Sequence, residues 1–247
     1  MNKSDVESLA TEIRDKSAEV IVSWAIEKFG RDSVALATSF GAEDQALTDM
    51  LAKAGKNARI FTLDTGRLPI ETFDTLDATQ RRYSINIEIV RPDPASVEKM
   101  ITEHGENLFY ESPEKRKLCC RVRKVEPLEK KLKNLKAWIC GLRKEQSNSR
   151  ELIQKIEWDE NFGLFKVNPL ADWSGDDVWN YIKKNDVPYN KLRDRGYTSI
   201  GCAPCTRAVK PGEDFRAGRW WWETSGAAKE CGLHAGNAST EKMKRSD

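Results

Sequence analysis

Short apolar runs alternate with helical patterns in this chain, and this alternation limits the possible folds more than any other feature. The strand-like runs are SVALATSF (33–40), RIFTLDTG (59–66), INIEIV (85–90) and KAWICGLR (136–143). Apolar residues at helical spacing separate them, at 43–55, 68–83, 95–104 and 121–133. Strands and helices in alternation, with short connections, predict an α/β fold in which helices cover both faces of a parallel sheet.

The two ends of the chain carry their own signals. Apolar positions between Ser4 and Phe29 recur at helical spacing with a break near Lys16, which indicates two helices or one interrupted helix. The segment SGDDVWNYIKKN (174–185) begins with a serine cap and predicts a late helix. The last residues are rich in Gly and Ala and then polar. We therefore expect one α/β domain at 1–225 and a mobile C-terminal tail at 226–247.

Charge and cysteine content exclude several classes of protein. Lys and Arg number 41 against 39 Asp and Glu, so a general attraction for nucleic acid or anionic membranes is not expected. No apolar run is long enough to span a membrane, and the start, MNKSDVESLATEIRDK, lacks the apolar core of a signal peptide. Six cysteines in 247 residues are too few for a secreted disulfide scaffold. A cytoplasmic protein whose cysteines serve metal or redox chemistry is the expectation.

Three turns follow predicted strands, at the sheet edge where ligands of such folds bind. They are TSFGAED, LDTGR and CGLR. Neither a G-x-G-x-x-G nor a G-x-x-x-x-G-K-[ST] motif is present, which argues against dinucleotide and Walker-type sites. Ser39 and Gly41 open onto a helix whose free N–H groups favour an anion, although an ordinary capped helix would look the same. Considered alone, Gly66 could be an ordinary turn glycine and Arg67 a solvent-exposed charge. Because the turns lie together at the edge of the sheet where ligands bind, they predict a ligand site.

Four cysteines form two close pairs. Cys119 and Cys120 are adjacent, which disfavours a disulfide between them, and Cys202 and Cys205 form a C-x-x-C pair in a loop. Adjacent side chains on a helix diverge by about 100°. This divergence favours ligands of separate irons in an iron–sulfur cluster over two corners of one zinc tetrahedron, and a Cys₄ zinc site remains the alternative.

The other two cysteines differ in setting. Cys140 lies in the apolar run AWICGL and is interpreted as a small buried hydrophobic residue. Cys231 lies in KECGLHAG, with Lys229 before it and His234 after it. Because basic neighbours favour the thiolate, Cys231 is a candidate nucleophile, with a tail cysteine of no function as the alternative.

Taken together, these motifs resemble those of assimilatory adenylyl-sulfate (APS) reductases of the iron–sulfur type, in the APS/PAPS reductase family. The resemblance rests on CCRVRKVEPL, YTSIGCAPCTR, GRWWWE and ECGLHAG, and SFGAED, LDTGRLPIETFD, NPLADWS and VPYNKL extend it from about 33 to 236. It implies a Rossmann-like fold similar to that of the adenine-nucleotide α-hydrolases. The implied reaction is reduction of APS to sulfite and AMP by reduced thioredoxin, in sulfate assimilation and cysteine biosynthesis.

The resemblance also implies roles for individual residues. Cys231 would be the nucleophile that forms an S-sulfocysteine intermediate, with His234 near it. A [4Fe-4S] cluster would be held by Cys119, Cys120, Cys202 and Cys205. The nucleotide would be bound by Ser39, Gly41, Leu63, Thr65, Gly66, Arg67, Gly141 and Arg143. The sulfate and phosphate would be surrounded by Lys124, Arg216 and Arg219.

The sequence departs from the family pattern at two positions, and two alternative functions remain compatible with it. The phosphate loop often has a second serine before its glycine, where this chain has Phe40, and Cys140 occupies a place usually taken by Thr or Ser. A PAPS reductase, or an enzyme with dual specificity, is the closest alternative, although PAPS reductases typically lack both cysteine pairs. A zinc-stabilised nucleotide-binding protein without turnover is the second. The oligomeric state stays open, and a homo-oligomer is compatible with the sequence.

Overall fold

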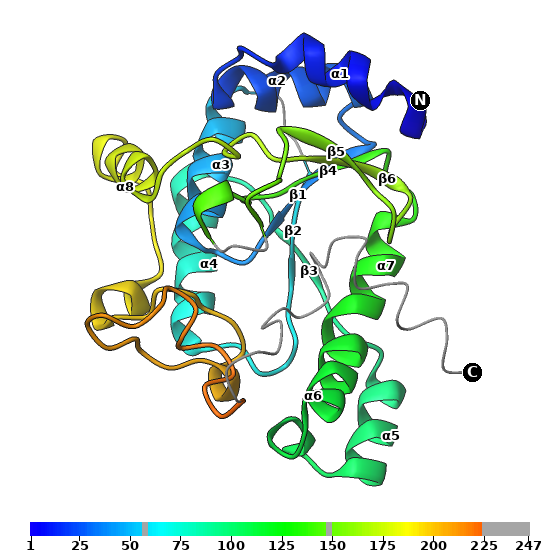
Figure 1. Cartoon of the computed structure of the whole chain (residues 1–247), viewed down its shortest axis with the longest axis vertical. Coiled ribbons are helices and arrows are strands. Elements are labelled where there is room, and N and C mark those ends of the chain that lie inside the picture. Colours follow the sequence, from blue (N-terminus) through cyan, green and yellow to red (C-terminus); the bar gives the residue numbers. More distant parts are fainter. Residues whose placement is uncertain (56–58, 147–149, 224–247) are drawn as a thin grey trace.

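A six-stranded sheet forms the centre of the structure, a computed structural model that describes residues 1–55, 59–146 and 150–223 (Figure 1). The strand order is β3-β2-β1-β4-β6-β5. The strands are β1 (Val34–Thr38), β2 (Arg59–Leu63), β3 (Glu88–Val90), β4 (Ala137–Ile139), β5 (Ile156–Asp159) and β6 (Leu164–Val167). All neighbouring strands run parallel except β5, which is antiparallel to β6. The predicted α/β fold is confirmed, and the predicted tail at 226–247 lies outside the described residues.

The antiparallel hairpin of β5 and β6 was not expected from the sequence. β6 contains Lys166, which breaks the apolar pattern, yet this lysine is only 6% exposed. Its ammonium group lies 5.5 Å from the centre of the Trp138 ring and 3.4 Å from the carboxylate of Glu157 on β5. A lysine that finds an aromatic ring and a carboxylate can occupy a buried strand position that its polarity alone would disfavour.

Helices surround the sheet, and most begin and end close to the predicted positions. They are α1 (Val6–Ile13), α2 (Ala18–Phe29), α3 (Ala42–Lys53), α4 (Ile70–Tyr83), α5 (Pro94–His104), α6 (Pro113–Cys120), α7 (Glu126–Leu132) and α8 (Gly175–Lys184). Short 3₁₀ helices occupy Lys3–Asp5, Leu108–Tyr110, Lys144–Gln146, Lys191–Arg195 and Ala203–Cys205, and a π-helical turn occupies Arg121–Val125. Among the described residues, none of these helices combines the length and apolar character needed to span a membrane.

Serine caps mark the starts of α2 and α8, and only the cap of α8 was predicted from the sequence. The Ser17 hydroxyl accepts a hydrogen bond from the backbone N–H of Val20, so the N-terminal helical pattern is two helices rather than one. At α8, the Ser174 hydroxyl and the Asp177 carboxylate form a reciprocal capping box, as the serine before this helix predicted.

The pleat of the strands sends alternate side chains into two cores, one on each face of the sheet. Val34 and Leu36 of β1 pack in the core that α1 to α4 cover, whereas Ala35 packs with Leu128 and Leu132 of α7 on the other face. Figure 1 shows α3 and α4 on one side of the strands and α7 on the other. Helices therefore cover both faces, as predicted for a sheet of this kind.

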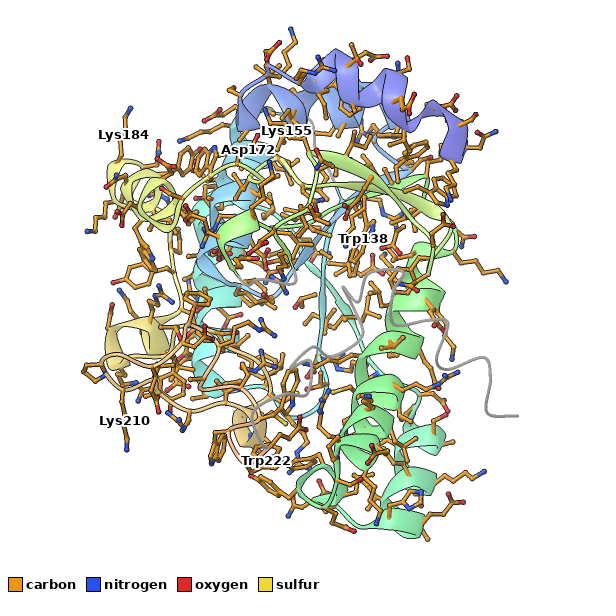
Figure 2. The ribbon with its side chains drawn as sticks, in the orientation of Figure 1. Trp138, Lys155, Asp172, Lys184, Lys210 and Trp222 are labelled. Carbon is orange, nitrogen blue, oxygen red and sulfur yellow. The ribbon has the colours of Figure 1, made fainter. Side chains whose placement is uncertain are left out.

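A third apolar cluster lies apart from the sheet and contains the paired cysteines. Its members come from α5, α6, the π-helical turn and the C-terminal segment, and include Cys119, Cys120, Cys202, Cys205 and Trp220. Figure 2 shows Trp138 near the middle of the molecule and Trp222, which packs against this cluster, at the end away from α1. The fold thus joins two cysteine segments that are about eighty residues apart in sequence.

Candidate active site

A cavity of about 510 Å³ opens where β1, β2 and β4 end. Its lining includes Ser39 and Gly41 after β1, Leu63 at the end of β2, and Gly141 and Arg143 after β4. The far wall comes from residues 189–201 and 215–219. The structure therefore brings two of the three predicted turns together at the carboxyl edge of the sheet, where ligands of open α/β folds bind.

The turn before α3 leaves the start of this helix without a side-chain cap. Gly41 occupies the cap position and has no side chain to offer, and Ser39 turns its hydroxyl and its N–H toward Asp44 instead, at 2.8 and 2.6 Å. Free N–H groups and the helix dipole at such a start favour an anion. The alternative of an ordinary side-chain cap does not describe this turn.

Asp44 accepts the hydrogen bonds from this turn, and its ionisation is disfavoured. Burial raises the pKa of Asp44 to about 6, although hydrogen bonds from Ser39 and from the backbone of Gly141 oppose the rise. A carboxyl group with this pKa gives up part of its negative charge when an anion approaches. The turn can therefore receive an anion next to an aspartate.

Close packing accounts for two unusual residues at this edge of the cavity. A Cβ atom on Gly141 would lie 2.4 Å from Asp44 Oδ1, so only glycine lets the turn after β4 approach α3 this closely. Phe40 adopts a left-handed backbone with φ of 59°, and its ring is buried in the core that α1 to α4 cover. Phe40, which departs from the family pattern, therefore holds the loop in place through the burial of its ring in this core.

The cations of the cavity differ in how they are neutralised. Arg143 is paired with Glu43 at 2.9 Å and lies 3.6 Å from Glu145. Arg219 is only 6% exposed, its Nε atom has no hydrogen-bond partner, and within the described residues no carboxylate lies at ion-pair distance. Its guanidinium group stacks on the Trp220 ring at 4.6 Å. A buried cation without a counterion is unfavourable, so this position favours an anionic ligand.

The four paired cysteines surround a second, smaller cavity of about 20 Å³. Each is about 8% exposed: Cys119 and Cys120 end α6, and Cys202 and Cys205 lie at the short helix Ala203–Cys205. Lys124 and Arg219 line both cavities, so the cysteine site adjoins the larger cavity. In the described part of the chain, no three or more His, Cys, Asp or Glu side chains are already arranged as ligands of one metal ion.

The thiol groups of this site influence one another. Burial raises the pKa of Cys202, but the Lys124 charge, a hydrogen bond with Thr65 (Oγ1–Sγ 3.2 Å) and the Arg219 charge lower it, and the net change is downward. Burial, together with the neighbouring charge of Cys202, raises the pKa of Cys205 to about 11. Several thiolates can therefore exist here together only with cations between them, which is what bound metal supplies.

A π-helical turn (Arg121–Val125) links α6 to α7 beside the cysteines. The sequence predicted an α-helix over 121–133, and this prediction was wrong in two respects: the helix begins at Pro113 as α6, and the widened turn interrupts it. Within the turn, Arg123 Nη1 donates to the backbone oxygen of Thr65 at 2.8 Å, and Lys124 faces both cavities. Such turns often mark functional sites, and no local sequence pattern announces them.

Leu63, the first residue of the third predicted turn, LDTGR, lines the larger cavity, whereas Thr65 and Arg67 lie at the cysteine site. Thr65 contacts Cys202, and the backbone oxygen of Arg67 accepts from the N–H of Ala203 at 2.8 Å. The Arg67 guanidinium donates to Glu106 and Asn107 at 2.9 Å each. Gly66, with φ of 73°, makes the sharp turn between them. Thr65 and Arg67 thus contact the segment that carries Cys202 and Cys205, and the expected contact of this turn with the nucleotide stays a prediction.

The remaining predictions concern Cys140, Cys231 and His234, and the structure bears only on the first of them. Cys140 is 2% exposed and packs in the core that α7 covers, so its predicted burial is confirmed. Cys231 and His234 lie outside the described residues.

A buried ion pair near the cysteines was not expected from the sequence. Arg116 Nε lies 2.8 Å from Glu223 Oε1, and both side chains are almost fully buried. Trp220 is stacked between Arg116, at 4.4 Å, and Arg219, at 4.6 Å. The basic run before Cys119 and the GRWWWE segment were both visible in the sequence, but their contact depends on the path of the chain.

Comparison with known proteins identifies the family. Residues 33–208 match the phosphoadenosine phosphosulfate reductase domain. The adenosine 5′-phosphosulfate reductase of Allochromatium vinosum is 51% identical over 203 residues, which cover 82% of this chain and 79% of that protein. The protein of the same name from Burkholderia cepacia is 52% identical, with 82% and 81% covered.

Solved structures agree with this relationship. The phosphoadenylyl-sulfate (PAPS) reductase of Candida auris superposes with a TM-score of 0.72 at 28% identity, over 85% of this chain and 98% of that one. The FMN adenylyltransferase of Candida glabrata, at 15% identity and a TM-score of 0.55 over 84% of this chain and 69% of that one, shares the fold alone. With most of its length matched by the family domain and about half of the aligned residues identical to those of named reductases, this chain belongs to the APS/PAPS reductase family of enzymes.

Proposed function

We propose that this enzyme reduces adenosine 5′-phosphosulfate to sulfite and AMP, as a step of sulfate assimilation toward cysteine. The observation that carries the proposal is the shared boundary of the two sites: Lys124 and Arg219 face both the cavity at the sheet edge and the cysteines. Relatives with about 50% identity are named for this substrate. A nucleotide in the larger cavity would place its anionic end against these cations.

The first step of the proposed reaction is a displacement at sulfur by Cys231. The thiolate attacks the sulfate sulfur, the S–O bond to the phosphate breaks, and AMP leaves with that electron pair, so an S-sulfocysteine remains on the enzyme. A thiolate approaching a phosphosulfate meets strong repulsion. Lys124, Arg216 and Arg219 would offset the developing charge, and the start of α3 would hold the phosphate.

The second step consumes a dithiol, for which reduced thioredoxin is the proposed donor. One thiolate attacks the Cys231 sulfur and expels sulfite, and the resulting mixed disulfide is resolved by the second thiol of the donor. The donor loses two electrons and the sulfur of the substrate gains them, so the reaction balances. Because the enzyme must keep several thiols reduced, the cytoplasm is the proposed compartment.

The cysteine site suits an iron–sulfur cluster, and we propose a [4Fe-4S] cluster held by Cys119, Cys120, Cys202 and Cys205. Four buried thiols around one cavity, with basic residues beside them, match the thiolate ligation and the negative charge of such clusters. When bound, the cluster would supply structural support and an electrostatic influence near the sulfate. A Cys₄ zinc site is the alternative, and iron and acid-labile sulfide content would distinguish them.

A single-turnover experiment tests the proposed function. The enzyme incubated with APS and no thioredoxin should release one AMP per active site and gain one SO₃ group, which peptide mass analysis should locate on Cys231. Reduced thioredoxin should then release sulfite. The variant Cys231→Ser should form no adduct while keeping its iron, and Cys140→Ser is the matched control that should react normally. An adduct on Cys140, or one that persists in Cys231→Ser, contradicts the proposal.

Specificity is tested by the same experiment with PAPS. The structural similarity to a PAPS reductase keeps this substrate in consideration. Sulfite formed from APS and not from PAPS supports the proposed function as stated, and equal rates would establish dual specificity. Failure with both nucleotides would favour a binding protein without turnover.

A further inference from the structure

Arg193 is a second cation of the larger cavity that stands without an acidic partner. It lies on the short helix Lys191–Arg195 and is half-buried in the wall opposite the sheet edge. Within the described residues it has no ion pair, in contrast to Arg143, which Glu43 neutralises at 2.9 Å. Neither the sequence motifs nor the resemblance singled it out.

The Arg193 side chain is held in place from three directions. Its guanidinium carbon lies 5.2 Å from the centre of the Trp179 ring and 5.5 Å from that of Phe215. Its Nη1 atom donates to the backbone oxygen of Thr198 at 2.7 Å. Two aromatic faces and one backbone acceptor fix the plane of the guanidinium before any ligand arrives, which lowers the entropy lost on binding.

The surroundings of Arg193 disfavour its charge. Burial lowers the pKa of its guanidinium, the Glu43 carboxylate opposes this change, and the Arg143 charge adds to it. A guanidinium carries five N–H donors, and only one hydrogen bond of this group is made within the described structure. The rings on either side can accept no conventional hydrogen bond from the remaining donors, so these donors are available to a ligand.

We propose that Arg193 binds an anionic group of the nucleotide substrate and contributes to its affinity. The proposal rests on the nucleotide reductase function proposed above, and a cavity of about 510 Å³ at this sheet edge is large enough for a nucleotide. The anionic group is a phosphate or a sulfate, whose oxygen atoms would accept hydrogen bonds from the guanidinium. It is attached either to the 5′ position of the nucleotide or, as a phosphate, to the 3′ position.

Calorimetric titration of the iron-loaded enzyme with three unreactive probes tests this assignment. The probes are adenosine, AMP and adenosine 3′,5′-bisphosphate, which differ only in their phosphates. The principal variant is Arg193→Gln, which keeps a polar side chain at this position without the charge, and Arg193→Met is the second variant in case the first does not fold. Arg195→Met removes one positive charge from the same short helix outside the cavity, and serves as the matched control.

In Arg193→Gln, we expect AMP affinity to fall by about 10- to 100-fold while adenosine affinity changes by less than about twofold. This outcome supports contact with the 5′ group. If AMP affinity is unchanged and only the affinity for adenosine 3′,5′-bisphosphate falls, Arg193 contacts a 3′ phosphate. Equal losses for adenosine and AMP, unchanged binding of every phosphate-bearing probe, or an equal effect of Arg195→Met overturns the proposal. Wild-type enzyme that binds none of the probes would instead contradict the proposed function itself.

Discussion

At Asp44, a single buried carboxyl group makes stability depend on pH. Its pKa of about 6 in the folded chain exceeds its ordinary value of 3.8 because burial disfavours the charge. Between these values the folded state holds a proton that the unfolded state has lost, so the contribution of Asp44 to stability falls as the pH rises. The shift corresponds to about 3 kcal/mol. Urea unfolding at pH 4 to 7 should show this decline in wild type relative to Asp44→Asn, and parallel pH profiles would contradict it.

Arg219 is the residue whose burial most directly indicates an anionic ligand. Arg219→Met should lower AMP affinity by about 10- to 100-fold, because it removes a charged donor from a desolvated position while keeping an apolar stem beside Trp220. The effect is measured by calorimetry. Arg207→Met is the control, since this arginine is more exposed and is paired with Glu213 at 2.8 Å. An affinity for AMP within twofold of wild type would remove Arg219 from the binding site.

At the scale of elements, the Arg116–Glu223 pair ties α6 to the C-terminal segment. Both side chains are buried, so removing the Glu223 charge deprives the buried Arg116 cation of this carboxylate. Glu223→Gln should lower the free energy of unfolding by about 3–5 kcal/mol, and adding Arg116→Met should recover most of the loss.

Urea unfolding of both variants measures this effect. Glu12→Gln breaks the exposed pair with Lys28 and serves as the control, with an expected loss of at most about 1 kcal/mol. A loss in Glu223→Gln no larger than that of the control would show that the buried pair does not hold α6.

Asp49 joins three helices through one carboxylate. On α3, it accepts hydrogen bonds from Tyr83 of α4 at 3.0 Å and Tyr181 of α8 at 2.7 Å, and pairs with Lys53. Burial and the Asp49 charge raise the pKa of both tyrosines, so their hydroxyls remain donors at neutral pH. Tyr83→Phe and Tyr181→Phe should each cost about 1.5–3 kcal/mol of unfolding free energy. Because they share one acceptor, their effects should not add in a double-mutant cycle.

For the whole molecule, we expect one cooperative unfolding transition. The sheet pairs β1 with β4 and β4 with β6, so residues from 34 to 167 depend on the same hydrogen-bonded core. Circular dichroism and tryptophan fluorescence should therefore report coincident transitions in urea. Separate transitions would contradict a single domain at 1–225.

A chain that ends at Ser225 should unfold at the same urea midpoint as the full chain and form no SO₃ adduct.

Local patterns in the sequence were sufficient for the larger part of the fold. The runs at 33–40, 59–66, 85–90 and 136–143 all contain strands, and the serine before α8 caps its helix as predicted. These features depend on neighbours within a few residues, which is why periodicity and cap chemistry identify them. The hairpin of β5 and β6 was missed because Lys166 depends on a distant ring, that of Trp138.

What the sequence determined by itself was the set of chemical groups: two cysteine pairs, a turn that can receive an anion, and the basic residues near them. Which cations lack a carboxylate, as Arg193 and Arg219 do within the described chain, was decided only by the tertiary structure. So was the position of Thr65, which contacts Cys202 and is not part of the lining of the larger cavity. The physical reason is that ion pairs and desolvation depend on contacts between segments far apart in the chain, and no local pattern records those contacts.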